Sequence, residues 1–258
     1  MGCEKLGTKS AESSIVTNSA ASHPIFVYKH VAMPACVSHR MAPMRTIPTT
    51  AAPAFAFSPM PLTHLLYLHG FRSSPQSTKA RLVAERVQTR HPALHWWCPQ
   101  LPPSPREAMD MLLAGVQDWP RAQMAVIGSS LGGFYASCVA EQTGCRAVLL
   151  NPAVHPARDL SRHLGEHSGW HDPAQRFVFT TAHVQELRAM ELPPEAPAAQ
   201  AAMGRLFAIV AKGDEVLDWR EMCARYPQAR IRLLEGSDHA IAEFPAYLDE
   251  VFDFLLTD

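Results

Sequence analysis

The sequence feature that most constrains the fold is an apolar run that ends in a glycine-rich turn, at residues 124–135. Four apolar residues lead into Gly128-Ser-Ser-Leu-Gly132, and a helical run that ends at Gly144 follows. A turn this abrupt places its middle residue, Ser130, at the tip with a positive φ, which is strained for a residue other than glycine. Glycine is expected on both sides because side chains there would collide where the strand and helix backbones pass.

The G-x-S-x-G pattern therefore predicts a nucleophile elbow, which lifts a serine hydroxyl above the edge of a sheet and points the first amides of the next helix at it. The alternative interpretation is a plain strand-to-helix turn in which Ser130 only caps the helix. The rest of the sequence favours the elbow, because an acidic residue and a histidine follow in the order that such hydrolases use.

Length and composition agree with one α/β domain plus additional sequence. The chain has 258 residues, a net charge of -1 and 47% apolar residues. A nucleic-acid-binding protein is usually basic, and this net charge does not indicate one. No apolar run approaches the roughly 18 residues of a membrane span. The six cysteines include no C-x-x-C pair, so neither a zinc site nor a disulfide framework is indicated, and a cytoplasmic protein with reduced thiols is the simplest interpretation.

Residues 1–61 differ from the rest of the chain. Their only acids are Glu4 and Glu12, no periodic pattern is sustained, and prolines recur from Pro34 onward. We expect a disordered N-terminal extension here and a single catalytic domain at 62–258. An organelle-targeting leader, or a translation start at Met44 or Met60, are the alternatives.

From residue 62 onward, apolar strand patterns alternate with helical patterns. The expected strands are 63–69, 94–98, 124–128, 146–150, 206–211 and 230–234. This alternation predicts an α/β fold with a mostly parallel sheet and helices on both faces. The stretch 153–204 is long for a bare crossover, so we expect a small lid there, with short helices near 156–164 and 183–190.

A serine nucleophile needs a base to take its proton and an acid to orient that base. Asp214 and His239 each follow an expected strand, and sites in such sheets lie at the carboxyl ends of strands. We therefore predict Ser130 as the nucleophile, His239 as the base and Asp214 as the acid.

Other residues near these positions compete for the same roles. Asp218 is an alternative acid, but it is expected in the next helix and facing away. Glu215 should point opposite to Asp214, and Asp238 should be solvated or bonded within its loop, because neighbouring side chains diverge. His239 itself could be a surface histidine.

The tetrahedral oxyanion formed by serine attack needs preorganised N–H donors. One expected donor is the amide of Leu131, directly after the nucleophile. The other is the amide of Phe71, in the loop after the first strand, where Gly70 lets the backbone come close. We interpret His69 as a structural residue bonded to this loop rather than as a proton-transfer group.

The predicted lid holds two further patterns. His163, His167 and His171 recur every four residues, but glycines interrupt any helix there and no carboxylate or cysteine completes a metal site, so a solvated lid is the preferred interpretation. Several large apolar residues either line an acyl pocket or pack the lid on the core: Trp170, Phe177, Phe179, Leu187, Met190 and Leu192.

The chain resembles the small bacterial esterases typified by YqiA over about residues 62–258. The motifs that carry this resemblance are His69-Gly-Phe-x-Ser-Ser-Pro75, Ile127-Gly-Ser-Ser-Leu-Gly-Gly-Phe-Tyr135, Asn151-Pro-Ala-Val154, Gly213-Asp-Glu-Val-Leu-Asp218 and Asp238-His-Ala240. The resemblance implies an α/β-hydrolase fold, hydrolysis of carboxylic esters or acyl thioesters, and no metal. It places the nucleophile, acid and base at Ser130, Asp214 and His239. Arg72 departs from the family, which often has a small polar residue there.

We therefore expect a serine esterase or thioesterase that acts on short to medium acyl chains through an acyl-enzyme. It should need no cofactor, and its partner should be a small-molecule ester or thioester rather than nucleic acid. An amide or carbon–carbon bond hydrolase of the same fold would show the same triad, and a non-catalytic binding protein of this fold is the third possibility.

Overall fold

A computed structural model describes residues 61–191, 193, 196 and 204–257. These residues fall within one compact unit, Phe55–Asp258. The predicted disordered extension lies outside the described residues except for Pro61, and so does Leu192 of the expected lid.

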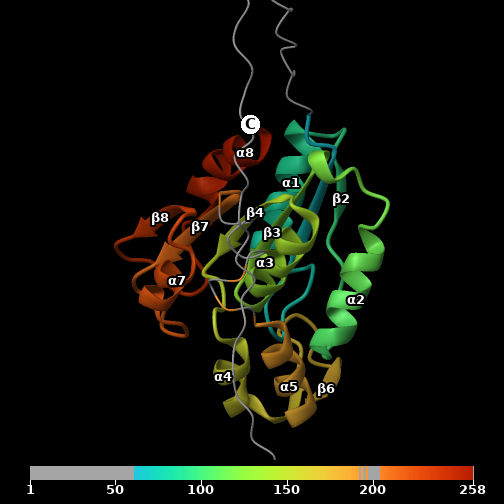
Figure 1. Cartoon of the computed structure of the whole chain (residues 1–258), viewed down its shortest axis with the longest axis vertical. Helices are drawn as coiled ribbons and strands as arrows, with labels where there is room; N and C mark the ends of the chain where they lie inside the picture. Colours follow the sequence, from blue (N-terminus) through green and yellow to red (C-terminus); the bar gives the residue numbers. More distant parts are fainter. Residues whose placement is uncertain (1–60, 192, 194–195, 197–203, 258) are drawn as a thin grey trace, which may run out of the picture. The chain divides into compact units, whose positions relative to one another are not determined.

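Six parallel strands form the central sheet (Figure 1). In chain order they are β1 (His64–Leu68), β2 (His95–Trp97), β3 (Met124–Ser129), β4 (Arg146–Leu150), β7 (Leu206–Ala211) and β8 (Arg230–Leu234). Their order in space is β2-β1-β3-β4-β7-β8. Each expected strand is present, and the predicted α/β fold with a parallel sheet is confirmed.

Helices cover both faces of the sheet because side chains alternate along each strand. Leu65 and Tyr67 of β1 share one core cluster with buried residues of α1 (Thr78–Arg90) and α8 (Leu248–Leu256). Leu66 and Leu68 belong to the opposite cluster. That cluster contains buried residues of α2 (Pro105–Gly115), α3 (Leu131–Thr143) and α7 (Trp219–Arg225). Short 3₁₀ turns η1 (Arg121–Gln123) and η3 (Phe244–Tyr247) precede β3 and α8.

The chain between β4 and β7 forms an insertion that the sequence analysis described only in part. It contains α4 (Pro156–Leu160), η2 (Ser161–His163), strands β5 (Gly165–Ser168) and β6 (Arg176–Phe179), and α5 (Thr181–Met190). The two helices were expected. The antiparallel β5–β6 pair was not, because four-residue strands in a stretch with charged and histidine residues carry too little periodicity to identify.

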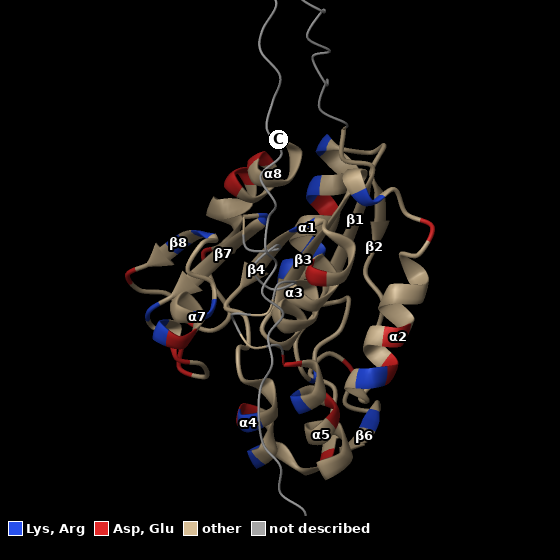
Figure 2. Ribbon diagram, in the orientation of Figure 1, with Lys and Arg blue, Asp and Glu red and all other residues tan. Residues whose placement is uncertain are grey.

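Charges of both signs are mixed along the same helices, for example on α2 and α7 (Figure 2). In the described part of the chain, no helix is both long and apolar enough to cross a membrane. The described cysteines, Cys98, Cys138, Cys145 and Cys223, are all free thiols.

The turn from β3 into α3 packs directly on the end of β1. A Cβ atom added to Gly132 would lie 2.1 Å from the carbonyl oxygen of Leu68, and one added to Gly128 would lie 2.1 Å from the carbonyl oxygen of Gly132. Both distances are far shorter than any real contact, and the atoms met are backbone. Only glycine therefore lets α3 start this close to the sheet.

We predict that Gly132→Ala lowers the free energy of unfolding by about 3 kcal/mol, because the extra methyl group must displace the backbone of β1. Urea unfolding followed by circular dichroism measures the change. Gly236→Ala is the matched control, since an added Cβ there meets no heavy atom of the described residues within 4 Å, and its effect should stay within about 0.5 kcal/mol. Equal stabilities of the two variants would contradict this account of the turn.

Candidate active site

Ser130 stands at the turn between β3 and α3 with φ 57° and ψ -122°, so the predicted positive φ is present. The end of β4 supports this strained backbone. The N–H of Ser130 donates to the carbonyl of Leu150 at 3.0 Å, and the N–H of Ala153 donates to the carbonyl of Ser130 at 3.0 Å. The peptide groups on both sides of the serine are therefore fixed, and its hydroxyl lies within hydrogen-bond distance of His239.

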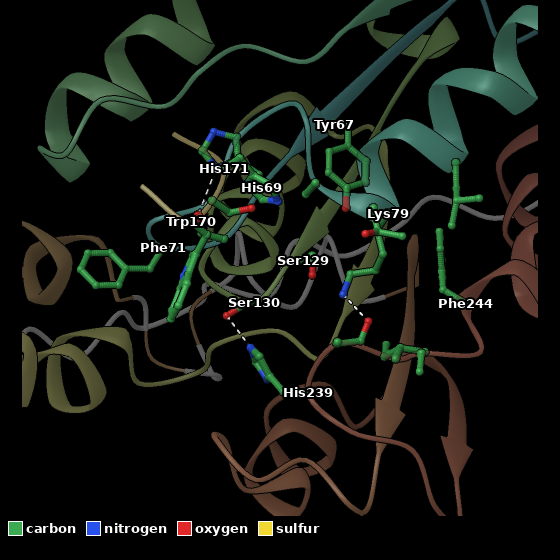
Figure 3. Close-up of a pocket in the computed structure, with 18 of the residues that line it drawn as sticks. Tyr67, His69, Phe71, Lys79, Ser129, Ser130, Trp170, His171, His239 and Phe244 are labelled. Atoms are coloured by element: carbon green, nitrogen blue, oxygen red, sulfur yellow. Dashed lines mark hydrogen bonds between the residues drawn. The ribbon is translucent and has the colours of Figure 1, made fainter. Parts of the chain in front are cut away.

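The imidazole of His239 links the serine to a carboxylate. Its Nε2 lies 3.0 Å from Oγ of Ser130 (Figure 3). Its Nδ1 lies 2.7 Å from Oδ2 of Asp214. A carboxylate accepts hydrogen bonds, so the proton of the neutral ring belongs on Nδ1, which donates to Asp214. Nε2 is then left to accept the proton of the serine hydroxyl.

The Asp214 side chain, which follows β7, is fully buried. Its other oxygen, Oδ1, accepts the N–H groups of Val216 and Leu217, both at 2.8 Å. These bonds hold the carboxylate toward the imidazole. The alternative acid, Asp218, instead caps α7 by accepting the N–H of Arg220 at 2.8 Å, so the structure brings Asp214 and not Asp218 to the histidine.

Glu215 differs from the sequence expectation. Its carboxylate does not point away from the site, because Oε2 accepts the backbone N–H of His239 at 3.0 Å. Two consecutive acids thus reach the same residue, Asp214 at its ring and Glu215 at its backbone. Asp238 behaves as expected and bonds within its loop, where Oδ1 accepts the N–H of Ala242 at 3.2 Å.

The loop after β1 passes close to the serine. A Cβ atom on Gly70 would lie 3.2 Å from Cβ and 3.6 Å from Oγ of Ser130, so only glycine permits this approach without crowding. Among the hydrogen bonds of the described residues, neither the N–H of Phe71 nor that of Leu131 has a protein acceptor. Both predicted oxyanion donors are therefore free to bond a ligand.

Aromatic packing joins this loop to the β5–β6 pair. The Phe71 ring lies edge-on to Phe177 and Phe179, with centroids 5.8 and 5.1 Å away. Arg72, which has φ 60°, donates from Nε to the carbonyl of Ser168 at 3.0 Å. Its guanidinium lies 4.1 Å from the centroid of the Trp170 ring, and the N–H of Trp170 donates to the carbonyl of Arg72 at 2.8 Å.

Asn151 is a site residue to which the sequence analysis gave no role. It follows β4, is completely buried and has φ 42°. Its Oδ1 accepts the N–H of Ala211 at 2.8 Å, and its Nδ2 donates to the carbonyls of Asp238 and His239 at 3.1 and 3.2 Å. One amide therefore connects the loop of the acid to the loop of the histidine. The sequence signal for this role is a polar residue directly after an apolar strand, at the edge of the sheet where sites are expected.

His69 is structural, as expected. Its Nδ1 donates to the carbonyl of Gly70 at 3.0 Å, and its Nε2 accepts the N–H of Leu101 at 3.1 Å. Burial lowers the pKa of His69 to about 4, although the bond to Gly70 opposes this shift. Through these two hydrogen bonds the neutral ring connects the loop after β1 to the segment that precedes α2.

A cavity of about 470 Å³ opens in front of Ser130 and His239 (Figure 3). It extends past Phe71 and Trp170 on the insertion side and past Lys79 of α1. A second cavity, of about 200 Å³, lies against Phe71, Leu131 and Phe177. Of the residues expected to line an acyl pocket, Trp170 reaches the first cavity and Phe177 the second.

The other described residues that were expected to line a pocket pack in the core instead. The three histidines lie on different elements. Phe179 and Leu187 are buried in the core, and Met190 packs against it. His163 ends η2, His167 lies in β5 and His171 follows Trp170 in a loop, so the three do not share a helix face. Among the described residues, no group of three metal-binding side chains is close enough to hold an ion.

A family model described as an uncharacterised protein family, UPF0227, matches residues 64–256. The chain belongs to this family. UPF0227 is the YqiA family that the sequence motifs indicate, and its model spans the whole of the described sheet.

Solved structures similar to this UPF0227 chain are α/β hydrolases of low sequence identity. The mouse alpha/beta hydrolase domain-containing protein 10 is 15% identical, with a TM-score of 0.54 over 74% of this chain and 90% of that one. Est1E from Butyrivibrio proteoclasticus, bound to ferulic acid, is 12% identical, with a TM-score of 0.54 over 74% and 86%. A structure from work on the metagenome-derived lipolytic enzymes LipS and LipT is 16% identical, with a TM-score of 0.53 over 76% and 96%. At these identities the likeness establishes the α/β-hydrolase fold.

We predict that Asn151→Ala lowers kcat by up to about 100-fold, because the loops of Asp214 and His239 lose their common anchor and small displacements of reacting groups are costly. Three backbone groups also lose their partner, one of them in the buried residue Ala211, which should lower the free energy of unfolding by about 1–3 kcal/mol. Ser137→Ala is the matched control, since its buried hydroxyl donates to the carbonyl of Phe134 within α3 and makes no bond to the loops of Asp214 and His239. A kcat that falls equally in both variants would show that general destabilisation is responsible.

We predict that His69 makes stability depend on pH in a defined window. The folded-state pKa of about 4 lies below the usual 6.5, so the stabilisation is complete above pH 6.5 and is lost as the pH falls toward 4. The slope contributed by this one group reaches about 1.4 kcal/mol per pH unit. Urea unfolding between pH 7 and 4.5 should be less pH-dependent in His69→Gln than in wild type. Parallel curves for wild type and His69→Gln would contradict the prediction.

Proposed function

We propose that this chain is a serine hydrolase that cleaves carboxylic esters or acyl thioesters through an acyl-enzyme. The observation that carries the proposal is the continuous hydrogen-bonded series from Oγ of Ser130 through the His239 ring to Asp214, at 3.0 and 2.7 Å. A serine hydroxyl needs this kind of partner because it is a weak nucleophile at neutral pH.

In the first half of the reaction, Oγ of Ser130 attacks the carbonyl carbon of the substrate while Nε2 of His239 takes the hydroxyl proton. The buried carboxylate of Asp214 stabilises the imidazolium that forms. The tetrahedral intermediate then collapses, and the bond to the leaving alcohol or thiol breaks as His239 returns the proton to it. The acyl group remains on Ser130.

In the second half, a water molecule gives its proton to His239 and its oxygen attacks the acyl carbon. Collapse of this intermediate releases the acid and returns the proton to Oγ of Ser130. Acidification should suppress both halves, because a protonated imidazole cannot accept a proton.

The free N–H groups of Phe71 and Leu131 are the proposed oxyanion donors. They flank Ser130 from two different elements, the loop after β1 and the start of α3. Loss of one such donor typically raises the barrier by about 3 kcal/mol. Gly70 supports this role, since its missing side chain lets the loop after β1 come close to Ser130.

The size of the cavity supports a small-molecule substrate with a short to medium acyl chain. Its volume of about 470 Å³ is within the range of roughly 300–1,000 Å³ that small-molecule sites occupy. In this proposal the insertion at 153–204 acts as a small lid, because Trp170 and His171 line the cavity from that side. The similarity to lipolytic enzymes and to Est1E supports esters over other acyl compounds.

We predict that Ser130→Ala lowers the hydrolysis of p-nitrophenyl butyrate by at least about a thousandfold without changing the thermal unfolding temperature appreciably, because the nucleophile is lost while the fold is kept. A fluorophosphonate probe should label wild type at Ser130 and leave the variant unlabelled, as shown by peptide mass spectrometry. Ser161→Ala is the control, since its hydroxyl bonds locally to the carbonyl of Arg158. Undiminished turnover in Ser130→Ala would refute the proposal.

A further inference from the structure

One side chain of the main cavity has no part in the proposed chemistry. Lys79, the second residue of α1, extends into the cavity in front of Ser130 and His239 (Figure 3). Among the described residues that line this cavity, Lys79 is the one Lys, Arg, Asp or Glu. The cavity next to the nucleophile is therefore lined by formal charge of one sign.

The ammonium group has capacity to bond a ligand. Nζ donates one hydrogen bond, to the carbonyl of Ala240 at 2.5 Å, in the loop that follows His239. Within the described part of the chain, no carboxylate forms a salt bridge with it. An ammonium group has three donors, so two of them remain for an acceptor in the cavity.

The stability of α1 does not account for this lysine. A cation in the first turn of a helix opposes the helix dipole, so it does not stabilise α1. Burial removes water from around the ammonium group and lowers the pKa of Lys79 to about 8. The carboxylates of Asp238 and Asp214 partly oppose this shift. The group still carries its charge at neutral pH, and an anion in the cavity would compensate it.

The surroundings of Lys79 suit an oxyanion. The hydroxyl-bearing residues Ser73, Ser77 and Thr78 line the same cavity. Three acids lie near the site, but Asp214 is enclosed behind the histidine, with no exposed side-chain surface, and neither Glu215 nor Asp238 is among the lining residues. A substrate anion would therefore meet the ammonium before it met a carboxylate.

We propose that Lys79 determines specificity by binding a carboxylate or phosphate of the substrate while the ester carbonyl lies at Ser130. The preferred substrates would be esters whose acid or alcohol part carries such an anionic group. This inference rests on the proposed hydrolase function, and it names the substrate class of the same site.

The test compares esters that differ only in charge. For the acid side, monomethyl glutarate, adipate and pimelate are each paired with the corresponding methyl ester that ends in a primary amide. For the alcohol side, 2-acetoxyethyl phosphate is paired with 2-acetoxyethanol. We expect kcat/KM of the anionic ester to exceed that of its neutral partner by about tenfold or more in one of these two arms, as a hydrogen bond to a charged group provides.

The variants Lys79→Met and Lys79→Gln should bring this anionic-to-neutral ratio close to one. Both variants also lose the bond to Ala240, which affects neutral esters as well, and for this reason the ratio is the readout. Arg81→Met is the matched control, because it removes one positive charge from an exposed position of the same helix, and it should keep the ratio of wild type. A ratio near or below one in wild type in both arms, or a ratio that survives loss of Lys79, would overturn the inference.

A binding measurement separates this inference from the proposed function. Ser130→Ala protein, with and without Lys79→Met, is titrated calorimetrically with monomethyl adipate, with 2-acetoxyethyl phosphate and with their neutral partners. If wild type hydrolyses no ester but Ser130→Ala binds an anionic ester at least about tenfold more tightly when Lys79 is present, the anion site stands and the hydrolase proposal fails. Binding that does not depend on Lys79 overturns the anion site itself.

Discussion

The arrangement of the site depends on how His239 is fixed. Its ring contacts Ser130 and Asp214 through the two nitrogens, its backbone N–H donates to Glu215, and its carbonyl accepts from Asn151. A histidine in an exposed loop would lose considerable rotamer and backbone freedom on taking this position. Four separate contacts, from residues that follow β3, β4 and β7, offset that loss before any substrate arrives.

These contacts are possible because the sheet is parallel. Residues that are more than 100 positions apart in the chain, such as Ser130 and His239, meet because the strands that precede them end at the same edge. The strained backbones of Ser130 and Asn151, with φ values of 57° and 42°, lie at the ends of the adjacent strands β3 and β4. The sheet keeps these conformations in place, because each residue also bonds to the neighbouring strand end through its N–H.

Much of this arrangement could be predicted from the sequence, and the failures have a common cause. The elbow is encoded locally, since Gly128 and Gly132 are required by backbone contacts within the turn and with β1. The strands and the order of acid and histidine are also readable along the chain. The roles of Asn151 and Glu215 were missed because each acts through bonds to residues 24 to 88 positions away. No periodic pattern records such contacts, and the four-residue strands of the β5–β6 pair are too short to produce one.

The contact between Arg72 and Trp170 joins the insertion to the loop after β1. Arg72 is the next residue after Phe71, and it is bonded to the insertion through the carbonyl of Ser168, the Trp170 ring and the Trp170 N–H. The insertion therefore holds the residue that directly follows Phe71 through three separate contacts. The cavity wall at Trp170 and the loop beside Ser130 thus form one connected unit, although they lie in different parts of the chain.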